Sequence, residues 1–236
     1  MLQELSLGYR LYVLIVKDLL GLYYKTYHRL KVEGAEHLRR EGPLFIIINH
    51  VSYLEPFALG VALCDHGILP VSHFWTVSKK ELFQFPPIGK FLSSLGMFPI
   101  DREKTDMAAM RTMLGVFKAG KMIAMAPEGT RSPSGRLQAF QPVVAKIAIS
   151  RHIPILPAAA IGAEQAMPVG SKFARPKQIT IRFGPVFELA EFYDQPLTDA
   201  EADRASWMMR EQIAALLPAW MRELPPPSGR VGARKV

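Results

Sequence analysis

A histidine and a glutamate lie five residues apart directly after an apolar run. His50 follows Phe-Ile-Ile-Ile-Asn at residues 45–49, and a short turn could return the carboxylate of Glu55 to the imidazole. Such a carboxylate accepts a hydrogen bond from one ring nitrogen, fixes the tautomer and leaves the other nitrogen to take a proton from a hydroxyl. A histidine at a strand end is also often held by a carboxylate for structural reasons, so other segments must decide between these interpretations.

A second polar cluster follows a second apolar run. Residues 127–132 have the sequence Pro-Glu-Gly-Thr-Arg-Ser and come shortly after Met-Ile-Ala-Met at 122–125. Both apolar runs are continuous rather than alternating, which predicts central strands covered on both faces. Ligands of open α/β sheets bind in the crevice at the carboxyl ends of the strands. The two clusters therefore predict one site.

Three other signals of chemistry are rejected. Residues 115–122 approach a P-loop pattern, but Met122 replaces the hydroxyl residue that holds magnesium, and the glycines precede a strand. The sequence contains no Gly-x-Ser-x-Gly or His-Glu-x-x-His motif. The consecutive side chains of Cys64, Asp65 and His66 diverge, so we expect a buried thiol at a helix end and no metal site.

The elements that would position the two clusters alternate along the chain. Strand-like runs lie at residues 44–49, 74–78, 97–100, 121–126, 155–161 and 178–183. Helical composition occurs at 52–63, 79–95, 104–119, 141–150 and 198–222. This alternation predicts an α/β domain over residues 30–224, with a mixed, largely parallel sheet flanked by helices.

The two ends of the chain differ from this domain. On a helical wheel, residues 1–29 place Arg10, Lys17, Lys25 and His28 on one polar arc, opposite a wide arc of leucine, isoleucine, valine and tyrosine. This pattern predicts an amphipathic helix in a membrane interface, although packing on the domain's own core is the alternative. Residues 225–236 are rich in proline and basic residues, which predicts a disordered basic tail.

Composition narrows the class of partner. The 236 residues carry a formal net charge of +8, which favours a phosphate-bearing partner such as nucleic acid, anionic lipid or a phosphorylated substrate. No motif that interleaves aromatic and basic residues supports nucleic acid, so we expect none. With one cysteine, Cys64, the described sequence cannot form an intramolecular disulfide.

Four blocks of sequence suggest a family. They are, in chain order, His50-x-x-x-x-Glu55, Gly-Met-Phe-Pro-Ile-Asp-Arg at 96–102, Pro-Glu-Gly-Thr-Arg-Ser at 127–132 and Ile-Leu-Pro-Ala at 155–158. In order and spacing they resemble the motif blocks of the glycerolipid acyltransferases, whose best-known members are the lysophosphatidic acid acyltransferases. The resemblance spans about residues 44–162, and the block at 127–132 is its most specific part.

The resemblance implies a reaction and its catalytic groups. The reaction is transfer of a fatty acyl group from acyl-CoA or acyl carrier protein to the free hydroxyl of lysophosphatidic acid, in phospholipid biosynthesis and without a cofactor. His50 would deprotonate the hydroxyl, and Glu55 would orient the imidazole and stabilise its charged form. Backbone N–H groups near Gly129 would hold the oxyanion.

The resemblance also implies substrate-binding residues. Arg102 and Arg131 would bind the acceptor phosphate, because the guanidinium group fits phosphate with two parallel hydrogen bonds. Lys79 is expected in the same pocket or on the phosphates of CoA. Glu128 and Thr130 complete the expected substrate-binding set.

The chain departs from the family pattern in two places. Glu55 stands where the family usually has Asp, and the extra methylene moves the carboxylate by more than an ångström unless the backbone compensates. Phe140 is followed by Gln-Pro-Val at 141–143 rather than by a basic residue and glycine. These differences keep two alternatives open, namely another lysolipid or glycerol-phosphate acceptor, or a non-catalytic lipid-binding protein. In each case we expect membrane lipids as partners, at the cytoplasmic face of a membrane, with peripheral or monotopic attachment.

Overall fold

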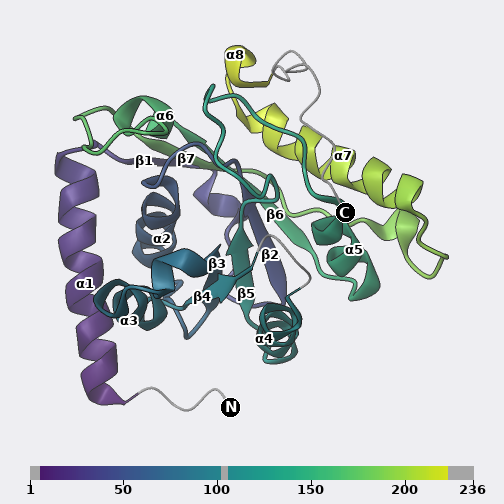
Figure 1. Cartoon of the computed structure of the whole chain (residues 1–236), viewed down its shortest axis with the longest axis horizontal. Helices are drawn as coiled ribbons and strands as arrows, with labels where there is room; N and C mark the ends of the chain where they lie inside the picture. Colours follow the sequence, from purple (N-terminus) through teal and green to yellow (C-terminus); the bar gives the residue numbers. More distant parts are fainter. Residues whose placement is uncertain (1–5, 102–105, 223–236) are drawn as a thin grey trace.

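A single sheet forms the centre of the part of the chain that the structure describes, residues 6–101 and 106–222 of a computed structural model (Figure 1). Its seven strands have the order β1-β7-β6-β2-β5-β3-β4, and every pair is parallel except β6 and β7. The strands are β1 Lys31–Glu33, β2 Leu44–Ile48, β3 Phe74–Lys79, β4 Met97–Ile100, β5 Met122–Met125, β6 Ile155–Ile161 and β7 Thr180–Phe183. The predicted mixed, largely parallel sheet is confirmed.

The two apolar runs form neighbouring central strands. All five residues of β2 are buried, and Ile46 lies opposite Ala124 of β5 on one side and Leu156 of β6 on the other. A strand buried on both faces needs the continuous apolar sequence that identified it. Because β2 and β5 are parallel, the segments that leave their carboxyl ends emerge side by side, and these segments carry the two polar clusters.

Strand β1 is absent from the sequence prediction. Its three residues pair with β7 at the edge of the sheet, with Val32 opposite Ile181, and its end residues are exposed. Three residues with one partly buried side chain give no apolar run to detect.

Helices surround the sheet. They are α1 Leu7–Thr26, α2 Glu55–Asp65, α3 Pro86–Ser94, α4 Met107–Lys118, α5 Pro142–Ser150, α6 Ala163–Ala166, α7 Asp199–Leu216 and α8 Ala219–Arg222, with short 3₁₀ turns η1 Ala35–His37, η2 Lys80–Phe83 and η3 Ala190–Phe192. Helices α5 and α7 pack on each other, and α7 also contacts β6. In Figure 1 this pair lies on the side of the sheet opposite α1 and α3.

Two predicted helices are divided in the structure. The helix expected at 79–95 is the turn η2 followed by α3, because the first residue of α3 is the first of two consecutive prolines, Pro86 and Pro87. The helix expected at 198–222 ends at Leu216 and resumes at Ala219 after Pro218. Proline lacks the N–H that a helix interior requires and disfavours helical geometry in the residue before it.

The N-terminal helix packs through a narrow face. Ser6 caps α1 by accepting a hydrogen bond from the N–H of Tyr9, and Val13, Gly21 and Tyr24 are the buried residues of the helix. Much of the wide apolar arc remains exposed, including Leu7, Leu11, Ile15, Leu19 and Leu22. Among the described helices, none has the length and apolar character needed to cross a membrane. The tail at 225–236 lies outside the described residues.

One residue of the helical wheel is placed differently in the structure. The wheel put His28 on the polar arc, but α1 ends at Thr26 and His28 is fully buried. Its Nε2 lies 3.1 Å from the hydroxyl of Tyr23 and its Nδ1 3.1 Å from the carbonyl of Lys177. Burial lowers the pKa of His28, so this imidazole does not contribute to a basic face.

Candidate active site

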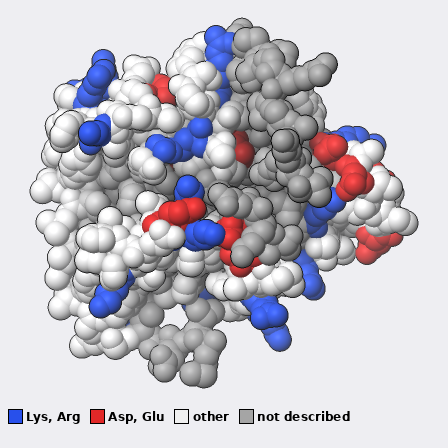
Figure 2. All heavy atoms as spheres, viewed as in Figure 1, with Lys and Arg blue, Asp and Glu red and all other residues white. Residues whose placement is uncertain are grey.

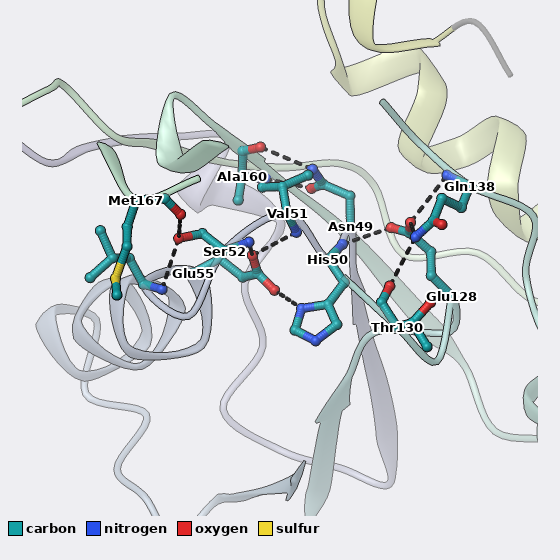
Figure 3. A network of polar contacts seen from close by, with 11 residues as sticks. Asn49, His50, Val51, Ser52, Glu55, Glu128, Thr130, Gln138, Ala160 and Met167 are labelled. Carbon is teal, nitrogen blue, oxygen red and sulfur yellow. Dashed lines mark hydrogen bonds and ion pairs between the residues drawn. The ribbon is translucent and has the colours of Figure 1, made fainter. Parts of the chain in front are cut away.

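The structure brings His50 and Glu55 into direct contact, as Figure 3 shows. His50 stands two residues after the end of β2, and Glu55 is the first residue of α2. Nδ1 of His50 is hydrogen-bonded to Oε1 of Glu55. Because Nδ1 is engaged, Nε2 is the nitrogen with which the ring can accept a proton from another group.

The second carboxylate oxygen of Glu55 binds the loop that carries the histidine. Oε2 accepts hydrogen bonds from the backbone N–H groups of Val51 at 2.8 Å and Ser52 at 2.6 Å. The side chain of Glu55 is fully buried, and its carboxylate lies at the start of a helix, where N–H groups are free to donate. The side chain of Glu55 thus reaches back from the first residue of α2 to the loop that precedes the helix.

Three other segments are hydrogen-bonded to the same loop. The hydroxyl of Ser52 donates to the carbonyl of Met167 at 2.8 Å, and the hydroxyl of Tyr24 in α1 donates to the carbonyl of Leu54 at 2.9 Å. The amide of Asn49 donates to the carbonyl of Ala160 at 3.0 Å and accepts from its N–H at 2.7 Å. The imidazole therefore projects from a loop whose backbone is bonded on both sides.

Both carboxylate oxygens of Glu128, a member of the expected substrate-binding set, accept hydrogen bonds from protein groups. It is buried, and its Oε1 accepts from the backbone N–H of His50 at 2.7 Å. Its Oε2 accepts from the backbone N–H of Gln138 at 3.1 Å and from the Nε2 amide of the same residue at 2.9 Å. Burial raises the pKa of Glu128 to about 7 in spite of these donors, because desolvation disfavours the charged carboxylate.

Gly129 forms the sharp turn after Glu128. Its φ of +76° is a left-handed conformation that favours glycine, and its N–H donates to the carbonyl of Ala126 at 3.2 Å. This N–H is already engaged within the turn, so an oxyanion donor here has to come from a neighbouring N–H group. Gln141, in the segment that departs from the family pattern, packs its side chain beside Gly129 and donates its N–H to the carbonyl of Pro127 at 2.8 Å.

A cleft of about 460 Å³ opens beside His50 and Glu55, which both line it. His50, Thr130 and Arg131 line it together with Lys79, whose side chain is more than half exposed. The rest of the lining is mainly apolar and includes the buried side chains of Ile48, Leu59, Leu92, Met97 and Ala124 and the partly buried ones of Phe57, Val77 and Leu82. The cleft is therefore lined by both basic and apolar side chains, with the imidazole of His50 among them.

The expected phosphate-binding residues are placed as follows. The guanidinium carbon of Arg131 lies 3.5 Å from the centroid of the Tyr53 ring, which supports it from one side. Lys79 lies 3.6 Å from the carboxylate of Glu81, another residue of the cleft. Thr130 is exposed, and its carbonyl accepts from Gln138 at 2.9 Å. Arg102 lies outside the described residues.

Cys64 lies where the sequence predicted, near the end of α2, and it is largely buried. Burial raises the pKa of its thiol to about 11, so the thiolate is disfavoured. Among the described residues, no group of three or more histidine, cysteine, aspartate or glutamate side chains is arranged to hold a metal ion.

Sequence reasoning missed Gln138 and Tyr53. Gln138 joins Glu128 to the carbonyl of Thr130 through its side-chain amide, but an isolated glutamine in a loop carries no motif. Tyr53 lies inside the His50-x-x-x-x-Glu55 block, so its position between the two catalytic candidates was the available signal.

Comparisons with known proteins agree with this fold. The sequence is 27% identical over 149 residues to a chloroplastic 1-acyl-sn-glycerol-3-phosphate acyltransferase of Arabidopsis thaliana, covering 62% of this chain and 40% of that protein. It is 34% identical over 103 residues to the 1-acyl-sn-glycerol-3-phosphate acyltransferase of Bacillus subtilis, covering 44% of this chain and 49% of the relative. The matches thus span half or less of these two relatives.

Another relative matches over more of its length, and a solved structure shares the fold. The 1-acyl-sn-glycerol-3-phosphate acyltransferase of Pseudomonas aeruginosa is 28% identical over 207 residues, covering 86% of this chain and 73% of the relative. The crystal structure of the 1-acyl-sn-glycerophosphate acyltransferase PlsC from Thermotoga maritima matches with a TM-score of 0.67 and 21% identity, covering 88% of this chain and 80% of that one. The sequence profile named Acyltransferase matches residues 29–161. That match covers more than half of the 236 residues, and the chain belongs to the acyltransferase family.

Proposed function

We propose that the protein transfers a fatty acyl group from an acyl thioester, acyl-CoA or acyl carrier protein, to the free hydroxyl of lysophosphatidic acid. The observation that carries this proposal is the imidazole of His50, bonded through Nδ1 to Glu55 in a cleft lined by both basic and apolar side chains. The relatives named as 1-acyl-sn-glycerol-3-phosphate acyltransferases support the same acceptor. The product is phosphatidic acid, an intermediate of phospholipid biosynthesis.

In this proposal His50 acts as the general base. Nε2 removes the hydroxyl proton of the acceptor as its oxygen forms a bond to the thioester carbonyl carbon, and the resulting imidazolium is stabilised by Glu55. The carbon–sulfur bond then breaks, and the proton passes from His50 to the departing thiolate. The bonds from Glu55 to the N–H groups of Val51 and Ser52 keep the carboxylate in place during both steps.

The lining of the cleft provides for the remaining parts of the two substrates. The guanidinium of Arg131, held over Tyr53, binds the acceptor phosphate, with Lys79 and the hydroxyl of Thr130 beside it. Arg102 belongs to this group by sequence. The acyl chain lies against the apolar side chains of the cleft, where its burial releases water from apolar surface.

The oxyanion of the tetrahedral intermediate requires donors from the turn around Gly129. The N–H of Gly129 is bonded to Ala126, so we assign the role to the adjacent backbone N–H groups of the turn. The absence of a side chain at Gly129 lets the thioester approach this part of the backbone.

Exposed apolar side chains on α1 support attachment to a membrane that holds the acceptor lipid. We propose peripheral or monotopic attachment, because α1 would lie in the interface rather than cross it.

The experiment that tests the proposal is incubation of the purified protein with lysophosphatidic acid and palmitoyl-CoA, followed by measurement of free thiol and lipid mass spectrometry. We expect phosphatidic acid from the wild type and a loss of about 10²–10⁴-fold in the His50→Ala variant. Palmitoyl acyl carrier protein in a parallel reaction identifies the donor.

A panel of acceptors identifies the lipid. Glycerol 3-phosphate, lysophosphatidylcholine and an ornithine lysolipid replace lysophosphatidic acid at equal concentration. Faster turnover of one of these would reassign the acceptor and keep the chemistry. Release of no thiol with any donor and acceptor, under conditions in which the protein is folded, would leave a non-catalytic lipid-binding protein.

A further inference from the structure

Helix α3 and the residue before it expose apolar side chains that are not packed in the core. Phe85, which precedes the helix, is 59% exposed, and Ile88 and Phe91 are 44% and 38% exposed. Ile88 and Phe91 lie three residues apart, so they share one face of the helix. The buried residues of α3 are Gly89 and Leu92, which lie toward the protein. Clustered apolar exposure of this kind marks an interaction surface.

This surface is continuous with the exposed side of α1. The hydroxyl of Tyr9 donates to the carbonyl of Ser94, and the hydroxyl of Tyr12 lies 2.8 Å from Oγ of Ser94 at the end of α3. The two helices lie next to each other in Figure 1, and in Figure 2 the same side of the molecule is mostly uncharged. Helix α1 also exposes the apolar side chains of Leu11 and Ile15.

The opposite side of α3 belongs to the wall of the cleft. Leu92 lines the cleft, and so does Leu82 in the turn η2 that precedes the helix. Gly89 allows α3 to pack tightly on this turn, since an added Cβ would lie 2.9 Å from the carbonyl oxygen of Phe83. Helix α3 therefore separates the cleft from any lipid that contacts the outer face of this helix.

The charges around the apolar surface fit an anionic bilayer. Helix α3 contains no acidic residue, and Lys90 on it is exposed. Helix α1 carries Arg10, Lys17 and Lys25; Lys17 is paired with Asp18 at 3.0 Å, and Lys25 with Asp65 of α2 at 2.9 Å. Apolar side chains beside exposed basic ones such as Arg10 and Lys90 are the pattern of segments that lie in the headgroup layer of anionic membranes.

From these observations we propose that α3 is a second membrane-contacting element, which inserts Phe85, Ile88 and Phe91 into an anionic bilayer beside α1 and so places the cleft at the lipid surface. The purpose of this contact, delivery of a lysolipid acceptor, rests on the proposed function. The contact itself does not depend on catalysis, so it is measured separately.

The test is flotation of the full chain with vesicles of phosphatidylcholine and phosphatidylglycerol. For the double variant Ile88→Ser and Phe91→Ser we expect the vesicle partition coefficient to fall at least about tenfold, since two partly exposed apolar side chains no longer enter the bilayer. Trp207→Ser is the matched control, because Trp207 is 50% exposed on α7, away from α1 and α3, and its loss should leave binding unchanged.

A second variant tests insertion of α3 into the bilayer in case the double variant alters folding. In Phe91→Trp we expect tryptophan fluorescence to be quenched by brominated lipid more than in the wild type. Thermal unfolding of each variant without vesicles checks that the fold is kept.

Three outcomes would overturn the proposal. One is unchanged flotation of the double variant, and another is an equal loss in Trp207→Ser. The third is a wild-type dimer that the double variant converts to a monomer, which would make this face an interface between two copies. If flotation falls as expected while no acyl transfer is found with any acceptor, the membrane contact stands and the proposed function fails.

Discussion

Glu55 binds three groups at once, and its length is what allows this. One oxygen contacts the imidazole of His50, and the other accepts from the N–H groups of Val51 and Ser52. In Glu55→Asp the shorter side chain withdraws the carboxylate from these donors. We expect kcat to fall at least about tenfold, equivalent to ~1.4 kcal/mol of barrier, in steady-state assays of acyl transfer.

Other substitutions at His50 and Glu55 provide the comparison for the kcat of Glu55→Asp. His50→Ala removes the base, and Glu55→Gln keeps the shape of the side chain while stabilising the imidazolium less, so the first should be more damaging than the second. A strong increase in activity for Glu55→Asp would mean that the natural glutamate detunes the site. Wild-type kcat in both Glu55→Gln and Glu55→Ala would show that the assigned pair is not catalytic.

Tyr53 positions Arg131 through its ring rather than its hydroxyl. The guanidinium carbon lies 3.5 Å from the ring centroid, and a cation–π contact at such a site is worth about 0.5–2 kcal/mol. Tyr53→Leu should therefore raise the KM for the phosphate-bearing acceptor several-fold with less effect on the donor KM. Tyr53→Phe should retain the wild-type KM. Equal changes in both KM values would assign Tyr53 a structural role.

Arg131→Ala should affect the acceptor more than Tyr53→Leu does. A charge-assisted contact to phosphate is worth roughly 1.5–3 kcal/mol, which is at least about tenfold in acceptor KM. The same comparison applies to Arg102→Ala. If either variant raises the donor KM equally, that arginine binds CoA phosphates or supports the fold.

Glu128 makes stability depend on pH. Its pKa is raised from an ordinary 4.5 to about 7 in the folded protein, so the folded state holds the proton more tightly than the unfolded chain does. The stabilising contribution is complete below pH 4.5 and is lost as pH rises through 7, by about 3 kcal/mol. Thermal or urea unfolding should show this decline in the wild type and not in Glu128→Gln. Parallel pH profiles of the two proteins would contradict the expectation.

At the scale of elements, the strands were easier to predict than the helices. Strands β2 and β5 are buried on both faces, so an unbroken apolar run identifies them. The prediction of one helix at 79–95 was wrong because it rested on helical composition over the whole segment, while Pro86 and Pro87 divide that segment into η2 and α3. Edge strand β1 has too few residues to produce a pattern.

Residues of the candidate site that lie within one sequence block could be predicted to pair. Contacts between residues of different loops could not. His50 and Glu55 are close in sequence, so one turn is enough to pair them. Glu128 is acidic and belongs to the most specific block, which suggested substrate contact. Its carboxylate instead points inward because the N–H groups of His50 and Gln138 converge on it, and that convergence depends on how two loops cross.

Helix α1 offers a cleaner test of membrane attachment than removal of residues 1–29. Tyr24 and His28 belong to the buried part of the molecule, so their removal would also damage the fold. Leu11→Ser with Leu19→Ser changes two exposed side chains only. We expect this variant to shift from the membrane pellet to the supernatant with an unchanged unfolding temperature. A wild-type protein that stays in the supernatant without detergent or lipid would refute membrane attachment.

At the scale of the whole molecule, the net charge of +8 should appear as salt dependence. Binding to vesicles that contain phosphatidylglycerol should weaken as ionic strength rises, because screening reduces the attraction between exposed charges. Part of the binding should persist, since burial of apolar side chains is not screened. Vesicles of phosphatidylcholine alone are the control, and equal salt dependence on both would contradict an electrostatic contribution.

The hydrogen bond from Tyr24 to Leu54 links α1 to the rest of the domain, so the two parts are not independent modules. The exposed side of α1 faces outward, while its inner side supplies the hydroxyl that binds the loop between Tyr53 and Glu55. An anchor that merely tethers a domain can be exchanged for an unrelated one, but α1 cannot, because a foreign helix would leave the buried carbonyl of Leu54 without its donor. Chimaeric proteins should therefore take α1 and the rest of the domain from the same parent sequence.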